Sequence, residues 1–153
     1  MGVMMKLIPY LNFAGNAHEA LAVYTEAFAG KIEELHLYNE NPELAKQLPA
    51  DWQNKIMHAT FRSAEFCFMA SDMSDDPAYA CSMPPRNPAG STVSLSLDFT
   101  SFEEQQRVFD LLTRDAKAIP MPLQDTFWGA RFGMLTDKFG IKWLFNYDYP
   151  QNN

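Results

Sequence analysis

Apolar and polar residues alternate along several short segments of the chain, and this pattern predicts strands. Successive side chains of a strand point to opposite faces, so one face should lie dry under a helix while the other meets solvent or a polar cavity. In TVSLSLDF the expected dry face is Val93, Leu95 and Leu97, and the polar face is Thr92, Ser94, Ser96 and Asp98. Near the N-terminus the same parity separates Leu7 and Leu11 from Ile8, Tyr10 and Asn12.

Two longer segments have the apolar period of an amphipathic helix, and each begins directly after a strand-like run. Ser101 lies 85 positions after Asn16, and the same offset relates Glu104 to Glu19. Each pair predicts a capping box, in which the Asn or Ser accepts from a backbone N–H and the Glu reaches back. Two caps in one register indicate an internal duplication. The expected apolar stripes are Leu21, Tyr24 and Phe28, then Phe102, Val108, Phe109 and Leu112.

After each helix the pattern predicts three strands. They are KIEELHLYN, KIMHATFRS and EFCFMAS, then AIPMPLQ, ARFGMLT and IKWLFNY. Residues 41–54 are expected to form a loop with a helical turn, and Asp137 and Gly140 are read as turn residues. On the last strand, Trp143, Phe145 and Tyr147 should share the helix-covered face.

These elements predict an α+β fold of two βαβββ modules, at about residues 5–72 and 92–149, with a proline-rich linker at about 73–91. The modules should form a single domain over residues 1–153. We expect a curved mixed sheet with the helices outside and a central cleft, where a small ligand would bind.

Composition narrows the classes of partner. Apolar residues make up 47% of the chain, which is typical of a globular core. The formal net charge is −7 with no basic run, so no nucleic-acid partner is expected. No segment approaches the ~20 apolar residues that cross a bilayer, so no membrane partner is expected either. Pro9 and Asn12 interrupt the opening residues too soon for a secretory signal, which favours a cytoplasmic protein.

Three segments, PYLNFAGNAHEALAVY, HATF and FWGARFGMLTDKFGIKW, resemble the PhnB-like branch of the vicinal oxygen chelate superfamily. That superfamily includes glyoxalase I, bleomycin and fosfomycin resistance proteins and extradiol dioxygenases. The resemblance covers nearly the whole chain and implies a glyoxalase-like domain that forms a homodimer. Members of the branch often carry names that imply a ubiquinone-pathway methyltransferase. No glycine-rich loop follows a strand here, so the sequence gives that name no support and no cofactor is expected.

The resemblance also implies where a metal would bind, because metal-using members of the superfamily draw four ligands from the first and last strands of each module. Those positions fall at Ile8, Met69, Thr92 and Leu144. A hard or borderline divalent metal needs imidazole or carboxylate donors. None of the four residues supplies one, so the sequence predicts that the usual metal site is absent.

His58, in the segment MHATF, is the candidate catalytic residue, because it matches a His-Ala pair of the PhnB-like pattern. Imidazole titrates near neutral pH, so a histidine on the inner face suits acid–base work or ligand hydrogen bonding. The alternative is a partly buried histidine satisfied by a backbone carbonyl or a neighbouring Asp. Cys67 is expected to pack in an apolar strand, and Cys81 is a candidate exposed thiol.

Several other residues are candidates for ligand binding. Trp128 would wall a ligand or seal a dimer contact, and Arg131 would bind a carboxylate or phosphate, or pair with a surface acid. The cleft would also receive hydrogen-bonding groups from Tyr10, Asn12, Ser94, Ser96 and Asn146.

Three functions remain open at this point. The first is a metal-free protein that binds a small organic molecule, with modest acid–base chemistry at His58. The second is a divalent-metal enzyme of the lyase, isomerase or dioxygenase type with a non-standard ligand set such as His58, His36 and a glutamate. The third is a drug-sequestering protein that binds without turnover.

Overall fold

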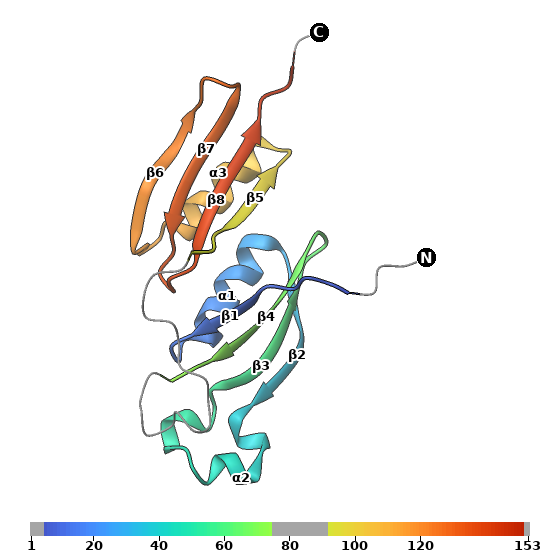
Figure 1. Ribbon diagram of the computed structural model, residues 1–153, viewed down its shortest axis with the longest axis vertical. Coiled ribbons are helices and arrows are strands. Elements are labelled where there is room, and N and C mark those ends of the chain that lie inside the picture. The colour runs from blue at the N-terminus through green and yellow to red at the C-terminus, as the bar shows by residue number, and fades with distance from the viewer. Residues whose placement is uncertain (1–4, 75–91, 152–153) are drawn as a thin grey trace. The chain divides into compact units, whose positions relative to one another are not determined.

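The computed structural model describes residues 5–74 and 92–151, and the chain divides into two compact units. Unit 1 is Met1–Pro88 and unit 2 is Ala89–Asn153. Figure 1 shows one helix and one four-stranded sheet at the centre of each unit. Within the described residues, no helix has the length and apolar composition to span a membrane.

Unit 1 follows the predicted βαβββ plan. Its sheet has the order β1-β4-β3-β2, in which β1 and β4 are parallel and the other pairs antiparallel. Two 3₁₀ turns and a short helix fill the loop expected at residues 41–54 and the positions just before it. The elements are β1 (Tyr10–Phe13), α1 (Ala17–Phe28), β2 (Lys31–Leu37), η1 (Tyr38–Glu40), α2 (Pro42–Ala45), η2 (Ala50–Trp52), β3 (Ile56–Arg62) and β4 (Cys67–Asp72).

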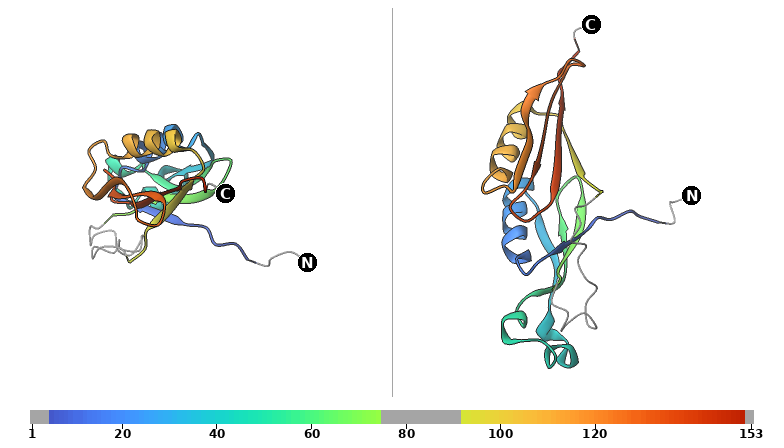
Figure 2. Two further views of the ribbon diagram at one scale, coloured as in Figure 1. Left: turned by 90° about the horizontal axis from the view of Figure 1, so that it is seen from above. Right: turned by 60° about the vertical axis from the view of Figure 1, so that its left-hand side comes forward.

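Unit 2 repeats the plan with the order β5-β8-β7-β6 and a parallel β5–β8 pair, which confirms the predicted duplication. In both units the helix lies against one face of its own sheet (Figure 2). The elements are β5 (Leu95–Phe99), α3 (Phe102–Leu112), β6 (Ala118–Asp125), β7 (Ala130–Thr136) and β8 (Lys142–Asp148).

Aromatic residues fill the space between helix and sheet in each unit. In unit 1, Tyr24 of α1 meets Phe68 edge-on at 5.8 Å, and Phe68 stacks on Phe61 at 4.6 Å. In unit 2, Phe109 of α3 meets Phe145 edge-on at 5.0 Å. The predicted helix-covered face of β8 is confirmed, since Trp143 and Phe145 are buried and Tyr147 packs against Phe102 at the start of α3. Phe102 itself remains exposed.

The turn between β7 and β8 is built by Asp137 and Gly140, as predicted. The buried Asp137 carboxylate accepts from the backbone N–H groups of Phe139 and Ile141, both at 2.9 Å. Its second oxygen accepts from Trp143 Nε1 at 2.8 Å, which ties the turn to the core. Gly140 has φ +94°, a conformation that favours glycine.

The two helix caps differ from each other. At α3 the Ser101 hydroxyl accepts from the Glu104 N–H at 3.1 Å, so this half of the predicted capping box is confirmed. The Glu104 carboxylate pairs with Arg107. At α1 the prediction was wrong, because the Asn16 side chain makes no capping hydrogen bond.

The role predicted for Asn16 is taken by Asp72, at the end of β4. One oxygen of its carboxylate accepts from the N–H of Ala17, the first residue of α1, at 2.9 Å. The other accepts from the N–H of Ile56, the first residue of β3, also at 2.9 Å. A negative charge at a helix N-terminus interacts favourably with the helix dipole. One fully buried carboxylate therefore joins the helix to the sheet.

The strand starts were predicted too early. β5 begins at Leu95, and the three residues before it are exposed, including Val93 at 65% where a dry position was expected. β1 begins at Tyr10, and Leu7 is 97% exposed. Alternation alone does not mark where pairing begins, because a strand needs a neighbour as well as the right pattern.

We predict that Asp72→Asn destabilises the protein by about 2–3 kcal/mol. The amide keeps one acceptor oxygen but turns an NH₂ group toward the second backbone N–H, which leaves a buried donor unsatisfied. Urea unfolding followed by far-UV circular dichroism measures the change. Asp51→Asn makes the same substitution at an exposed residue of η2 and should leave the midpoint unchanged. A wild-type midpoint for Asp72→Asn would show that another group holds α1.

Candidate functional site

The sheet of unit 1 presents a polar face opposite α1. Leu11 and Phe13 of β1 are buried under the helix, so the alternate residues Tyr10 and Asn12 point to the other side. The register of the sheet brings residues of the three other strands onto that side. We call this side of the sheet the polar face of unit 1: Tyr10, Asn12, Glu34, His36, His58, Thr60, Met69 and Ser71, of which Ser71 is buried.

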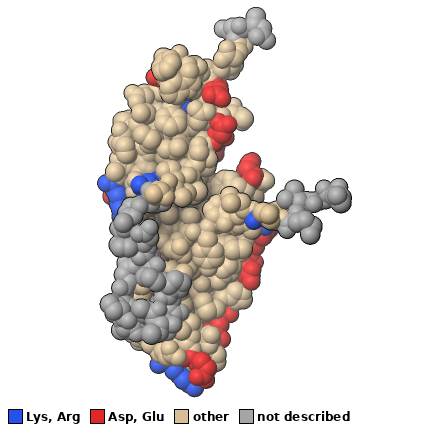
Figure 3. Space-filling model, viewed as in Figure 1, with Lys and Arg blue, Asp and Glu red and all other residues tan. Residues whose placement is uncertain are grey.

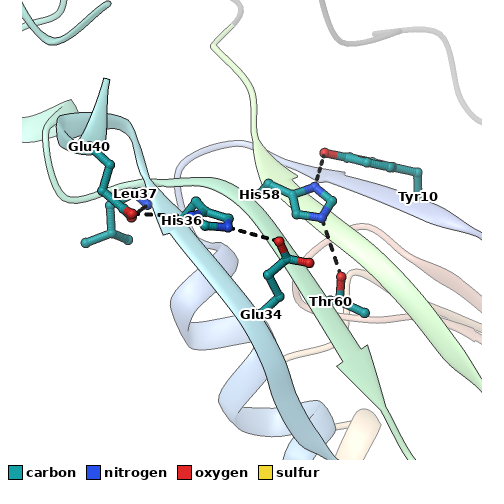
Figure 4. A network of polar contacts seen from close by, with 7 residues as sticks. All are labelled: Tyr10, Glu34, His36, Leu37, Glu40, His58 and Thr60. Carbon is teal, nitrogen blue, oxygen red and sulfur yellow. Dashed lines mark hydrogen bonds and ion pairs between the residues drawn. The ribbon is translucent and has the colours of Figure 1, made fainter. Parts of the chain in front are cut away.

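His58 lies on this face, held between two hydroxyl groups (Figure 4). Its Nδ1 is 3.2 Å from the Tyr10 hydroxyl, and its Nε2 is 3.4 Å from Thr60 Oγ1. The Tyr10 ring also packs against the imidazole, with centroids 5.8 Å apart. A tautomer with the proton on Nε2 accepts from Tyr10 and donates to Thr60. Partly exposed, His58 can exchange either contact for a ligand.

His36 lies directly opposite His58 in the β2–β3 register. Its Nε2 is 3.0 Å from the Glu34 carboxylate and its Nδ1 is 3.2 Å from the Glu40 carboxylate. Hydrogen bonds to Glu34 and then Glu40 raise the pKa of His36 above its ordinary value. A hydrogen bond from the Leu37 N–H, and to a smaller extent one from His36, holds the pKa of Glu40 below its usual range. Together the three side chains form a charged cluster beside His58.

The candidate residues of unit 2 lie on different surfaces of that unit. Ser96 and Asn146 are on the face opposite α3, where the Asn146 amide donates to Asp98 at 2.9 Å and to Asp148 at 3.2 Å. Ser94 is exposed and precedes β5. No strand pairing therefore positions Ser94, whereas Ser96 and Asn146 belong to the sheet.

Arg131 and Trp128 do not join Ser96 and Asn146. The Arg131 guanidinium lies over the Phe102 ring, 4.0 Å from its centroid, and bonds to Gln106 of α3. It therefore points to the helix side of the sheet. Trp128 is 58% exposed in the β6–β7 turn and meets Phe127 edge-on at 5.0 Å.

The residues at the superfamily's metal positions do not fit a metal. The parallel registers place Tyr10 beside Met69 and Ser96 beside Leu144, while Ile8 and Thr92 precede the first strands. If the two expected positions that precede the strands are moved onto them, at Tyr10 and Ser96, they still offer no imidazole or carboxylate donor. Across residues 5–74 and 92–151, no three or more His, Cys, Asp or Glu side chains stand in positions that could hold an ion.

Sequence reasoning missed the cluster of Glu34, His36 and Glu40 as a unit. The signal was available, because Glu34 and His36 are two apart on one strand and must share a face. Cys67 is only partly buried and lies opposite Arg62, and Cys81 lies outside the described residues.

Comparison with known proteins adds to this geometry. A family model described as 3-demethylubiquinone-9 3-methyltransferase matches residues 5–145. The chain is 36% identical to protein YjdN of Escherichia coli K12 over 149 residues, which is 93% of this chain and 95% of that protein.

Solved structures give the same answer for the fold. The PhnB protein from Bacillus cereus is 28% identical with a TM-score of 0.73, over 94% of this chain and 99% of that chain. A glyoxalase/bleomycin resistance protein/dioxygenase from Nocardioides is 14% identical with a TM-score of 0.54, over 100% of this chain and 90% of that chain. At that identity the likeness concerns the fold alone. The chain therefore belongs to the PhnB-like 3-demethylubiquinone-9 3-methyltransferase family and has the glyoxalase-type fold.

Proposed function

We propose that the protein binds a small organic molecule on the polar face of unit 1, with His58 as its central hydrogen-bonding group. The observation that carries this proposal is the position of His58 between the Tyr10 and Thr60 hydroxyls on a partly exposed sheet face. An imidazole held in one orientation donates or accepts at low entropic cost, which suits recognition of a ligand oxygen.

The charges around His58 indicate the class of ligand. Glu34 and Glu40 both contact His36, which lies opposite His58, and one imidazole offsets only part of the charge of two carboxylates, so an anionic ligand would be repelled. A neutral or cationic molecule with hydroxyl or carbonyl oxygens fits better. Met69 lies beside Tyr10 in the register and would give the ligand an apolar contact.

Any chemistry at this face would be proton transfer by His58 rather than methyl transfer. The sequence has no glycine-rich strand-to-helix loop of the kind that cradles a nucleotide-like cofactor. An imidazole within hydrogen-bond reach of a bound substrate can act as a general acid or base. This restricts the proposal to binding with at most modest acid–base catalysis.

We predict that protein purified without added ligand retains a small organic molecule, which native mass spectrometry would report together with the number of subunits. The homodimer expected from the resemblance stays a prediction that the same spectrum tests. Adding the identified molecule to a ¹⁵N-labelled sample should shift the amide resonances of Tyr10, His58 and Thr60 before others. Shifts confined to unit 2 would contradict the proposed location.

His58→Ala should weaken binding of that molecule about tenfold or more, which corresponds to about 1.4 kcal/mol for a lost hydrogen bond. Tyr10→Phe keeps the ring but removes the hydroxyl that orients His58, so it should give a smaller loss. His18→Ala is the matched control, because His18 lies on α1 and bonds to the Asn54 carbonyl at 3.0 Å. Equal affinity in wild type and His58→Ala would remove His58 from the site.

We predict that His36 titrates above the ordinary histidine value of 6.5 and that Glu34→Gln lowers its midpoint. A raised pKa in the folded state contributes stability that is fully present below the ordinary pKa and is lost as pH rises through the raised value. An NMR titration of the His36 ring protons measures it. Glu43→Gln alters a carboxylate on α2 that pairs with Lys46, the residue after that helix, and should not move the midpoint. An unshifted His36 would mean that its carboxylate contacts do not persist in solution.

A further inference from the structure

The hydrogen bonds of His36 identify its protonation state in this structure. Its Nε2 lies 3.0 Å from the Glu34 carboxylate, and its Nδ1 lies 3.2 Å from the Glu40 carboxylate. An ionised carboxylate can only accept a hydrogen bond, so both ring nitrogens of His36 must be donors. Only the imidazolium carries a proton on each nitrogen. The structure therefore has His36 in its charged form, bonded to two carboxylates at once.

The two carboxylates are not held equally firmly. Glu40 also accepts from the Leu37 N–H, which fixes it beside the end of β2. That bond, and then the one from His36, lower the pKa of Glu40, so its carboxylate stays ionised. The Glu34 side chain is 55% exposed, and within residues 5–74 and 92–151 its carboxylate bonds to His36 alone. Glu34 is therefore the more weakly held of the two.

Loss of one proton forces His36 to give up one of these contacts. A neutral imidazole has a single N–H donor, and its other nitrogen presents a lone pair. A proton on Nδ1 preserves the contact with Glu40, which the Leu37 N–H keeps in place. Nε2 then turns a lone pair toward the Glu34 carboxylate, and two acceptors repel each other. Glu34 is the group that is released, by rotation about its own χ angles.

The released carboxylate belongs to the face on which we place the ligand. Glu34 is opposite Thr60 in the β2–β3 register, and His36 is opposite His58. Figure 4 shows the Glu34 side chain on the side of the sheet that carries His58 and Thr60. A carboxylate without a partner accepts hydrogen bonds from a ligand, and bonds from a cationic donor such as an ammonium group are the strongest.

We propose that His36 is a proton-controlled switch for Glu34, and that Glu34 selects ligands that carry an amine or another cationic donor. When His36 is charged, its imidazolium occupies Glu34 and repels a second cation. When His36 is neutral, the cationic group of the ligand takes the place of the imidazolium. This inference rests on the proposed function, because His58 is taken to bind another part of the same molecule.

The charged groups around His36 set the direction of the pH dependence. The titratable groups that face it are Glu34 on its own strand, Glu40 on η1 and His58 on β3, with Tyr10 of β1 next to His58. Hydrogen bonds to Glu34 and then Glu40 raise the pKa of His36, so Glu34 is released only as the pH rises above the ordinary histidine range. Figure 3 shows acidic side chains along the β2 side of unit 1, a field that also favours a cation.

The release itself is tested without any ligand. We expect the ¹³C resonance of the Glu34 carboxyl group in the full-length protein to change with the same titration midpoint as the His36 ring protons. The Glu43 carboxyl group, which pairs with Lys46, is the internal control and should not respond at that midpoint. A Glu34 resonance that ignores the titration of His36 would overturn the proposal.

Glu40→Gln separates release from a mere effect of charge. The amide can donate to His36 Nδ1 and still accept from the Leu37 N–H, so a neutral His36 can keep its proton on Nε2 and keep Glu34. The response of Glu34 should therefore be much smaller than in the wild type, although His36 still titrates. An equally large response would overturn the switch. Far-UV circular dichroism establishes that the variant is folded.

The ligand class is tested with benzylamine, an ammonium cation at these pH values, and with benzyl alcohol as its neutral match. Benzylamine should bind about tenfold more tightly above the titration midpoint of His36 than below it, as expected for one charge-assisted hydrogen bond. Glu34→Gln should remove this pH dependence. Absence of benzylamine binding, or equal affinity on both sides of the midpoint, would overturn the role of Glu34. Benzyl alcohol binding to the wild type and to His58→Ala tests the proposed function separately, since it needs no cation.

Discussion

The buried carboxylate of Asp72 is the interaction on which unit 1 depends. It accepts from the first N–H of α1 and the first N–H of β3, and the Asp72 carbonyl accepts from the Tyr38 hydroxyl at 2.6 Å. A buried carboxylate is tolerated only when hydrogen bonds within the protein replace those it would make to water. Here the donors are backbone N–H groups at the start of a helix and of a strand, which also need partners when buried. Helix, sheet and the η1 turn are thereby fixed to one residue at the end of β4.

That connection determines which face of the sheet remains polar. With α1 held against Leu11 and Phe13, every alternate residue of β1 points away from the helix. A one-residue slip would bring His58 under α1 and expose Phe61, at a large cost in buried apolar area. The position of His58 beside Tyr10 is therefore a consequence of core packing. The candidate site at His58 needs no special loop, because β1 and β3 themselves present Tyr10, His58 and Thr60.

Local patterns in the sequence predicted most of this architecture. Period-two alternation located the strands, and Asp137 with Gly140 located the β7–β8 turn, because these signals depend on neighbouring residues alone. The α1 cap could not be found in this way, since Asp72 is 55 residues from Ala17 and its role arises only when β4 pairs with β1. The sequence also could not show on which side of the sheet the Arg131 side chain lies. Its contacts are with Phe102 and Gln106, which belong to a helix earlier in the chain.

The two units share a topology but differ in the faces that their helices leave uncovered. In unit 2 this face carries Phe132, Met134 and Leu144 beside a few polar groups, as the β7–β8 register shows. In unit 1 the corresponding surface carries imidazoles, carboxylates and hydroxyls. Duplication thus conserved the packing between helix and sheet, where volume and pattern are constrained, while the opposite faces diverged. At the superfamily's usual metal positions this sequence has Ile8, Met69, Thr92 and Leu144, none of which offers an imidazole or a carboxylate. The imidazoles of His36 and His58 lie instead on β2 and β3 of unit 1.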